Sequence, residues 1–251
     1  MIAGPLADTL SRVTATCRAQ PADASARMQL FRLLCVTGQW ERAAAALDVA
    51  GRLDAELGYT VLAHRAALAC ERFRAEVFAG RRAPLFAGEP DAGTAMLAQA
   101  LASSPEEAAG LRAAAFEAIE PSAGTIDGRP FEWLADADAR LGPVLEVFLD
   151  GKYYWVPISR IERLKLEMPT DVLDLVWCPA QLTLRGSVAQ ALLVPSRYPG
   201  SEACDDDALR LARRTDWQEL ADGQHRGLGQ RMFATDDDDV ALLDVRTIAF
   251  G

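Results

Sequence analysis

Residues 125–157 have the sequence TIDGRPFEWLADADARLGPVLEVFLDGKYYWVP, and the last part of this stretch decides the fold of the second half of the chain. Segments 144–149 and 152–156 have the length and the β-branched and aromatic content of strands. Asp150-Gly151 between them is the strongest short-range signal for a two-residue hairpin turn. The sequence therefore predicts a β-hairpin here.

The predicted hairpin is apolar on both faces. A two-residue turn places Phe148 opposite Tyr153, and side chains alternate between the faces of a strand. A strand pair that is apolar on both sides must be covered on both sides, so we expect cover from the protein's own helices or from a partner. One face carries Val144, Glu146, Phe148, Tyr153 and Trp155, and the other carries Leu145, Val147, Leu149, Lys152, Tyr154 and Val156.

The rest of the chain after Pro121 has the pattern of a mainly antiparallel β domain. Short apolar segments alternate there with turn-forming residues, which favours strands over helices. A short helix is expected over residues 206–213. The further predicted strands are 161–166, 173–177, 182–184, 190–194, 216–221, 226–234 and 240–248.

Residues 5–120 are rich in Ala, Leu and Arg and have helical periodicity. Asp23 and Ser104 stand where helix N-caps are expected, and Gly38 stands where a helix ends. The pattern predicts an antiparallel helical array. Its helices are expected over 6–19, from the Asp23 cap to Gly38, over 40–50, 53–79 and 91–102, and from the Ser104 cap onward.

Within this array, residues 33–47 resemble one helix pair of a tetratricopeptide repeat. The similarity consists of Leu33-Leu34, Gly38, Trp40 and a run of alanines, which in that repeat let two helices approach closely. An Ala-rich helical bundle is an alternative with the same pattern. Either interpretation gives an α+β protein with a helical, tetratricopeptide-like domain over 1–122 and a mainly β domain over 123–251.

Charge is distributed unevenly along the 251 residues. The formal net charge is -10, and residues 1–120 contribute only -2 of it, with 12 basic and 14 acidic side chains. A surface this acidic repels phosphate backbones, which argues against a nucleic-acid partner. We expect the C-terminal half to meet a basic patch on another protein.

The cysteine pattern indicates a reducing compartment, and the N-terminus and hydropathy pattern indicate a cytoplasmic protein. Cys17, Cys35, Cys70, Cys178 and Cys204 form no CxxC spacing, and we expect the first three to be buried helix thiols. The N-terminus lacks the apolar run of a signal peptide, and no segment has the 18 or so apolar residues of a membrane span. The sequence predicts a cytoplasmic protein without cofactor or metal.

Asp136, Asp138 and Arg140 form the cluster that most resembles a catalytic site. Two carboxylates and a guanidinium can bind a metal or transfer protons. On a helix, Asp136 and Arg140 would have ion-pair spacing, so an Asp-capped helical turn with an internal salt bridge is the structural alternative, and we favour it. An enzyme using this cluster remains the alternative function.

Other residues with reactive side chains lack the partners that chemistry requires. His64 lies within a predicted helix and His225 within a predicted hairpin turn, without the spacing of a zinc site. Ser201 follows a glycine but has no GxSxG motif. Gly227-Leu228-Gly229 lacks the third glycine of a nucleotide-binding loop, and it favours a β-bulge or a close strand crossing.

Three further segments, with residues 125–157, carry a resemblance to a known family. Residues 197–217 are RYPGSEACDDDALRLARRTDW, residues 227–236 are GLGQRMFATD, and residues 30–43 are LFRLLCVTGQWERA. In this order and over nearly the whole chain, they resemble the ImpE family, also called SciE or TagJ, whose members are accessory proteins of the bacterial type VI secretion system. The C-terminal run of four aspartates departs from the family's pattern.

The resemblance implies a non-enzymatic cytoplasmic adaptor and supplies no catalytic residues. It implies two partners: the N-terminal helix of the small subunit of the contractile sheath, and the ClpV-type AAA+ ATPase that disassembles contracted sheath. On physical grounds, grooves between stacked helices receive amphipathic helices, and Arg-aromatic groups are enriched at interfaces. The residues predicted to bind partners are Phe31, Leu34, Trp40, Phe73, Phe78, Tyr153, Trp155, Arg197 and Tyr198.

Overall fold

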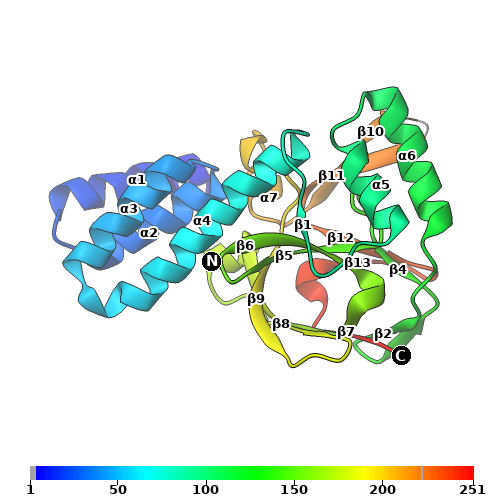
Figure 1. Ribbon diagram of the computed structural model, residues 1–251. Coiled ribbons are helices and arrows are strands. Elements are labelled where there is room, and N and C mark those ends of the chain that lie inside the picture. The colour runs from blue at the N-terminus through cyan, green and yellow to red at the C-terminus, as the bar shows by residue number, and fades with distance from the viewer. Residues whose placement is uncertain (1–3, 222) are drawn as a thin grey trace.

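A computed structural model describes residues 4–221 and 223–251. Helices α1–α4 form an array on one side of a curved, mainly antiparallel sheet, and α5 and α6 lie on the other side of the molecule (Figure 1). This arrangement confirms the α+β class predicted from the sequence. None of the helices in the described ranges is both long and apolar enough to cross a membrane.

The start and end signals predicted for the second helix are confirmed. Asp23 caps α2, because its carboxylate accepts a hydrogen bond from the Ala26 backbone N at 3.0 Å. Gly38 has φ +66° in the turn to α3, a backbone conformation that favours glycine. The predicted helix over 53–79 is interrupted at Asp54, whose side chain caps a short 3-10 turn. The bounds are α1 Leu6–Ala19, α2 Ala24–Val36, α3 Trp40–Leu53, η1 Ala55–Leu57 and α4 Gly58–Phe78.

A short strand separates this array from the remaining two long helices. Strand β1 (Leu85–Phe86) runs parallel to β6 at one edge of the sheet, and the sequence did not predict it. Helix α5 (Ala92–Ala100) starts at Asp91 and α6 (Pro105–Ala118) starts at a complete capping box formed by Ser104 and Glu107. The helix start expected at Ser104 is therefore confirmed.

The large sheet has nine strands in the order β1-β6-β5-β9-β8-β7-β14-β2-β3, and a three-stranded sheet has the order β13-β12-β4. Strands β10 and β11 form a separate antiparallel ribbon. The bounds are β2 Gly124–Ile126, β3 Arg129–Phe131, β4 Leu134–Asp136, β5 Val144–Leu149, β6 Lys152–Pro157, β7 Ile161–Leu166, β8 Trp177–Leu184, β9 Gln190–Pro195, β10 Thr215–Ala221, β11 Gln224–Gly229, β12 Met232–Thr235, β13 Asp239–Ala241 and β14 Thr247–Phe250.

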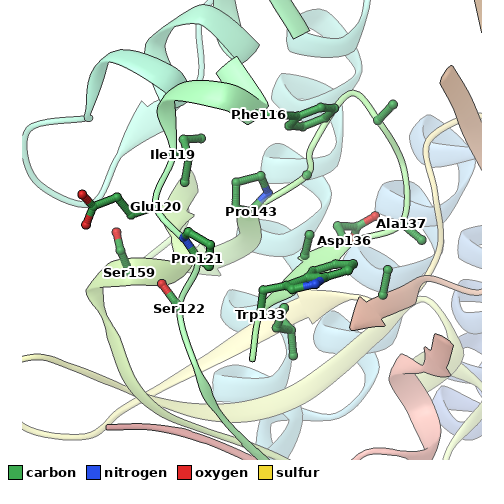
Figure 2. A pocket seen from close by; sticks show the side chains of 15 residues that line it. Phe116, Ile119, Glu120, Pro121, Ser122, Trp133, Asp136, Ala137, Pro143 and Ser159 are labelled. Carbon is green, nitrogen blue, oxygen red and sulfur yellow. The ribbon is translucent and has the colours of Figure 1, made fainter. Parts of the chain in front are cut away.

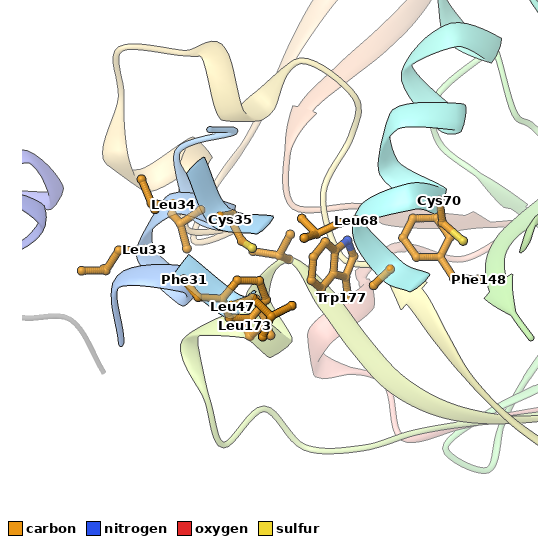
Figure 3. Close-up of a cluster of buried hydrophobic side chains, with 14 of the residues drawn as sticks. Phe31, Leu33, Leu34, Cys35, Leu47, Leu68, Cys70, Phe148, Leu173 and Trp177 are labelled. Carbon is orange, nitrogen blue, oxygen red and sulfur yellow. The ribbon is translucent and has the colours of Figure 1, made fainter. Parts of the chain in front are cut away.

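The predicted hairpin is confirmed, with Phe148 opposite Tyr153. Its turn residues Asp150 and Gly151 both have positive φ, +49° and +72°. One face packs against α1–α4 in a cluster that includes Trp155 and Trp177, part of which is drawn in Figure 3. The other face lies in a second cluster enclosed by the curved sheet. Both faces are thus covered by the protein itself.

Four predictions for the C-terminal half need correction. Segment 173–177 is the 3-10 turn η3 (Val172–Leu175) leading into β8, because Asp171 and Asp174 form a capping box around it. The predicted strand 226–234 is divided between β11 and β12, and 240–248 is divided between β13 and β14 by η5 (Leu242–Asp244). The Asp-capped turn expected over Asp136–Arg140 starts at Asp138, because Asp136 ends β4 and Asp138 accepts the Arg140 backbone N–H at 2.9 Å.

The hydrophobic clusters extend across the predicted domain boundary. Residue 122 lies between α6 and β2, where the pattern predicted the change from helix to strand. However, the cluster that holds α1–α4 together also contains Phe148, Tyr153 and Trp155 of the hairpin and Trp177 of β8. The helical array therefore shares its core with the sheet, and the division into units 1–122 and 123–251 remains a prediction.

Candidate functional site

The nine residues predicted to bind partners lie in the interior or partly within it. Six are buried: Phe31, Leu34, Tyr153, Trp155, Arg197 and Tyr198. Trp40, Phe73 and Phe78 are half-buried and pack against the shared hydrophobic cluster. Direct binding by these residues stays an untested prediction, and the structure gives them contacts within the chain.

The aromatic residues among them join the helices to the sheet in pairs. Trp40 of α3 stacks on Trp177 of β8 with ring centroids 6.2 Å apart. Phe73 and Phe78 of α4 each contact an aromatic residue of the β5–β6 hairpin. Each pair adds specific geometry to the burial of apolar area. The further pairs are Phe73 with Tyr153 at 6.2 Å and Phe78 with Trp155 at 6.3 Å.

Beneath these rings lies a network of buried charges. Arg74 of α4 donates hydrogen bonds from Nε and Nη2 to the two carboxylate oxygens of Glu146 on β5, at 2.7 and 2.9 Å. Arg231 approaches the same carboxylate at 3.1 Å. The Tyr153 hydroxyl also donates a hydrogen bond to the Glu146 carboxylate. Glu71 also belongs to the network, because it lies 3.6 Å from Arg74 Nη1 and accepts the Trp177 indole N–H at 2.8 Å.

Asp136, Asp138 and Arg140 belong to this buried network. Asp136 accepts hydrogen bonds from Arg231 and from the backbone N of Asp138. Asp138 forms the ion pair with Arg140, at 2.6 Å, and also accepts the Gly227 backbone N–H at 3.0 Å. The expected Asp136–Arg140 pair is therefore replaced by two others, because a strand followed by a tight turn separates these side chains.

Burial and pairing shift the ionisation of these carboxyls in different directions. Burial would raise the pKa of Glu146, but Arg74 and Arg231 together hold it below its ordinary value. For Asp136, burial prevails over the attraction of Arg231 and raises the pKa to about 6. Burial also raises the pKa of Glu71. The geometry assigns these groups to internal pairing rather than to contact with a substrate.

Arg197 and Tyr198 hold the C-terminal loops against the helices. The Arg197 guanidinium donates to the carbonyls of Val36 at 2.8 Å and Cys35 at 3.3 Å, and so satisfies the C-terminal end of α2. The Tyr198 ring lies against Gly227, where a Cβ would overlap it. The sequence favoured a β-bulge or a close strand crossing at Gly227-Leu228-Gly229, and the close neighbour at Gly227 is instead the ring of Tyr198.

Other residues considered for chemistry also have structural surroundings. The Ser201 hydroxyl donates to the Tyr198 carbonyl at 2.6 Å and accepts from the Gly229 backbone N at 2.7 Å. His64 packs against the Phe31 ring, with centroids 5.1 Å apart, and His225 is exposed on β11. Within residues 4–221 and 223–251, no three His, Cys, Asp or Glu side chains are grouped to hold a metal ion.

The exposed apolar surface of the helical array lies at the start of α4. Tyr59 is 90% exposed and Leu62 is 63% exposed. They border a hollow of about 740 Å³ between α3 and α4, whose rim carries an Asp48–Arg65 ion pair. Gly51 of α3 lets Val61 approach closely at its base. We call this surface the α3–α4 groove.

A second hollow, with a mainly apolar lining, lies between the end of α6 and the residues around β4 (Figure 2). Its volume is about 360 Å³, and Phe116 and Trp133 are its most exposed aromatic side chains, at 40% and 37%. We call it the α6–β4 pocket. Sequence reasoning missed both surfaces, although Tyr59 and Leu62 stand three apart at a helix start, which is a readable signal.

Comparison with known proteins decides the family. The model of the ImpE protein family matches residues 128–249. The type VI secretion system accessory component TagJ of Pseudomonas aeruginosa is 46% identical over 252 aligned residues, which cover 99% of this chain and 88% of that protein. The chain belongs to the ImpE family. The family resemblance seen in the sequence is thus confirmed.

A solved structure has the same fold as this ImpE-family protein over nearly the whole chain. The crystal structure of a Vibrio parahaemolyticus protein aligns with a TM-score of 0.90 and 26% sequence identity. The alignment covers 98% of this chain and 94% of the other. The helical array and the sheet therefore occur together in the same arrangement in a related protein.

Proposed function

We propose that this protein is a non-enzymatic, cytoplasmic accessory protein of a type VI secretion system. Its close similarity to TagJ supports this role. The carboxylates that most resemble a catalytic pair are buried and engaged by Arg231, Arg140 and backbone N–H groups, which supports an adaptor over an enzyme. The alternative of an enzyme that uses Asp136, Asp138 and Arg140 would require opening of this network.

The proposed first partner is the N-terminal helix of the small subunit of the contractile sheath. The observation that carries this proposal is the α3–α4 groove, where Tyr59 and Leu62 stand exposed at helical spacing beside a hollow. An amphipathic helix recognises such a groove through apolar anchors at positions i, i+3 and i+4. Full burial of one large apolar side chain stabilises a complex by about 1.5–3 kcal/mol.

The proposed second partner is the ClpV-type AAA+ ATPase that disassembles contracted sheath. The C-terminal half carries most of the net charge of -10, so it is suited to a basic surface on that partner. A protein that holds the sheath subunit on its helical array and the ATPase on its acidic half would bridge the two. By this bridging, the protein would modulate sheath disassembly.

The groove is tested by fluorescence anisotropy with a labelled peptide of the cognate sheath helix. Leu62→Asp places a charge in the groove, and we expect it to weaken binding by about tenfold or more. Met168→Asp is the matched control, because Met168 is an exposed apolar residue outside the groove. Equal affinity of wild type and Leu62→Asp would exclude the α3–α4 groove as the binding surface.

A further inference from the structure

The α6–β4 pocket is built from segments that the fold holds in place. Phe116, on the last turns of α6, packs against Gly142, and a side chain at position 142 would overlap its ring. Trp133 precedes β4, and Figure 2 shows its ring together with Phe116 and Pro143 around the hollow. The two exposed aromatic side chains therefore have defined positions before anything binds.

The lining of the pocket is mainly apolar. Alanines at 135, 137, 139 and 234 leave room between the larger rings of Phe116 and Trp133. Asp136 also lies at the pocket, but its carboxylate is engaged by Arg231 and the Asp138 backbone N. A volume of about 360 Å³ is that of a small-ligand site, and it suits one large apolar side chain with its neighbours.

Acidic residues occur in the lining of the pocket and near it in the chain. Glu120 lines the pocket, and no Lys or Arg does so among the residues that the structure describes. Glu117 and Glu132 are exposed and adjoin Phe116 and Trp133 in the chain. Asp236 lies beside Glu132, since it accepts the Glu132 backbone N–H at 2.7 Å. An occupant with positive charge beside its apolar anchor would complement this rim.

We propose that the α6–β4 pocket is a docking site for a partner segment that inserts one large apolar side chain and carries Lys or Arg beside it. Exposed aromatic residues around a preformed hollow are the usual composition of a binding hot spot. A second copy of this chain is a poorer occupant, because its own charge of -10 would be brought against an acidic rim. The proposal goes beyond the function above, since it concerns a surface formed by α6 and β4 rather than by α3 and α4.

Two synthetic peptides test the proposal with the full chain. Each forms about three helical turns and has the same Leu and Trp anchors, but one carries Lys beside the anchors and the other Glu. Fluorescence anisotropy of the labelled peptides measures each affinity. We expect the Lys peptide to bind about tenfold or more tightly than the Glu peptide at low salt, and the difference to shrink as salt is raised.

Matched variants assign the binding to the pocket. Trp133→Ala should weaken binding of the Lys peptide about tenfold, and Trp217→Ala should not, although Trp217 has a similar exposure of 40%. Glu120→Lys should weaken the Lys peptide about threefold, whereas Glu162→Lys, an exposed acid on β7, should leave it unchanged. Circular dichroism confirms that each variant is folded.

Three results would overturn the proposal. The first is that neither peptide binds to the folded protein. The second is that both peptides bind equally at low salt, because the acidic rim would then play no part. The third is that Trp133→Ala and Trp217→Ala have the same effect, because the peptide would then bind elsewhere.

Discussion

Arg74 of α4 and Glu146 of β5 form a fully buried, bidentate ion pair that joins the helical array to the sheet, with N–O distances of 2.7 and 2.9 Å. Arg74 also donates to the Arg197 carbonyl at 2.9 Å, and Glu146 accepts from Tyr153. Paired geometry and additional hydrogen bonds are what make a buried ion pair tolerable. The contact therefore fixes the orientation of α4 on the sheet.

The first prediction concerns the loss of this pair. Arg74→Met leaves the Glu146 carboxylate buried with one partner fewer, and we expect it to lower the free energy of unfolding by about 3–5 kcal/mol. Urea denaturation followed by circular dichroism measures the change. The double variant Arg74→Met/Glu146→Leu should cost less than the sum of the two single variants. Additive costs would show that the two residues do not stabilise each other.

The second prediction concerns the close packing of Gly227 on the Tyr198 ring. Gly227→Ala should lower the free energy of unfolding by about 1–3 kcal/mol, because its Cβ would overlap the ring. Gly110→Ala is the matched control. It lies within α6 with open space around it and should stabilise the protein by about 0.5–1 kcal/mol. Thermal and urea unfolding of both variants measure the difference, and a neutral Gly227→Ala would contradict the packing argument.

The third prediction concerns pH and His64. Burial, together with the charge of Arg32, lowers the pKa of His64, and its Nδ1 has no hydrogen-bond partner within the described part of the chain. The unfolded chain has a histidine pKa of about 6.5. Neutral His64 therefore contributes stability above about pH 6.5, and this contribution is lost as the pH falls through the lower folded-state pKa.

The comparison that isolates this effect is wild type against His64→Leu. On acidification from about pH 7 to 5, stability should shift in favour of His64→Leu, by at most about 1.4 kcal/mol per pH unit. Urea denaturation at several pH values measures it. Exposed His225→Gln is the control and should retain the dependence of wild type. The interpretation fails if the difference between wild type and His64→Leu does not change with pH.

Most helices and strands could be predicted because residues close in sequence, such as helix caps and turn residues, determine where they start and end. Asp23, Asp91 and Ser104 cap the helices that they were expected to start, and Asp150-Gly151 forms the predicted turn. By contrast, β1 has two residues and owes its existence to a distant partner, β6. Its pairing depends on tertiary contact, which no local pattern records.

The binding surfaces were harder to predict for a related reason. Hydrophobicity alone does not distinguish a buried residue such as Phe31 from an exposed one such as Tyr59, since both fit a helix face. The Asp136 cluster was recognised as unusual, but its partner Arg231 is distant in sequence. A pairing of that kind becomes visible only when the strands are placed.

The central claim is that the helical array holds the sheath subunit's N-terminal helix by apolar burial in the α3–α4 groove. Calorimetric titration of the full protein with that helix peptide, at low and at high salt, tests it most directly. We predict saturable binding with micromolar affinity that changes little with salt, because apolar contacts are not screened. Absence of binding by a folded protein and a helical peptide, or binding that salt abolishes, would contradict the claim.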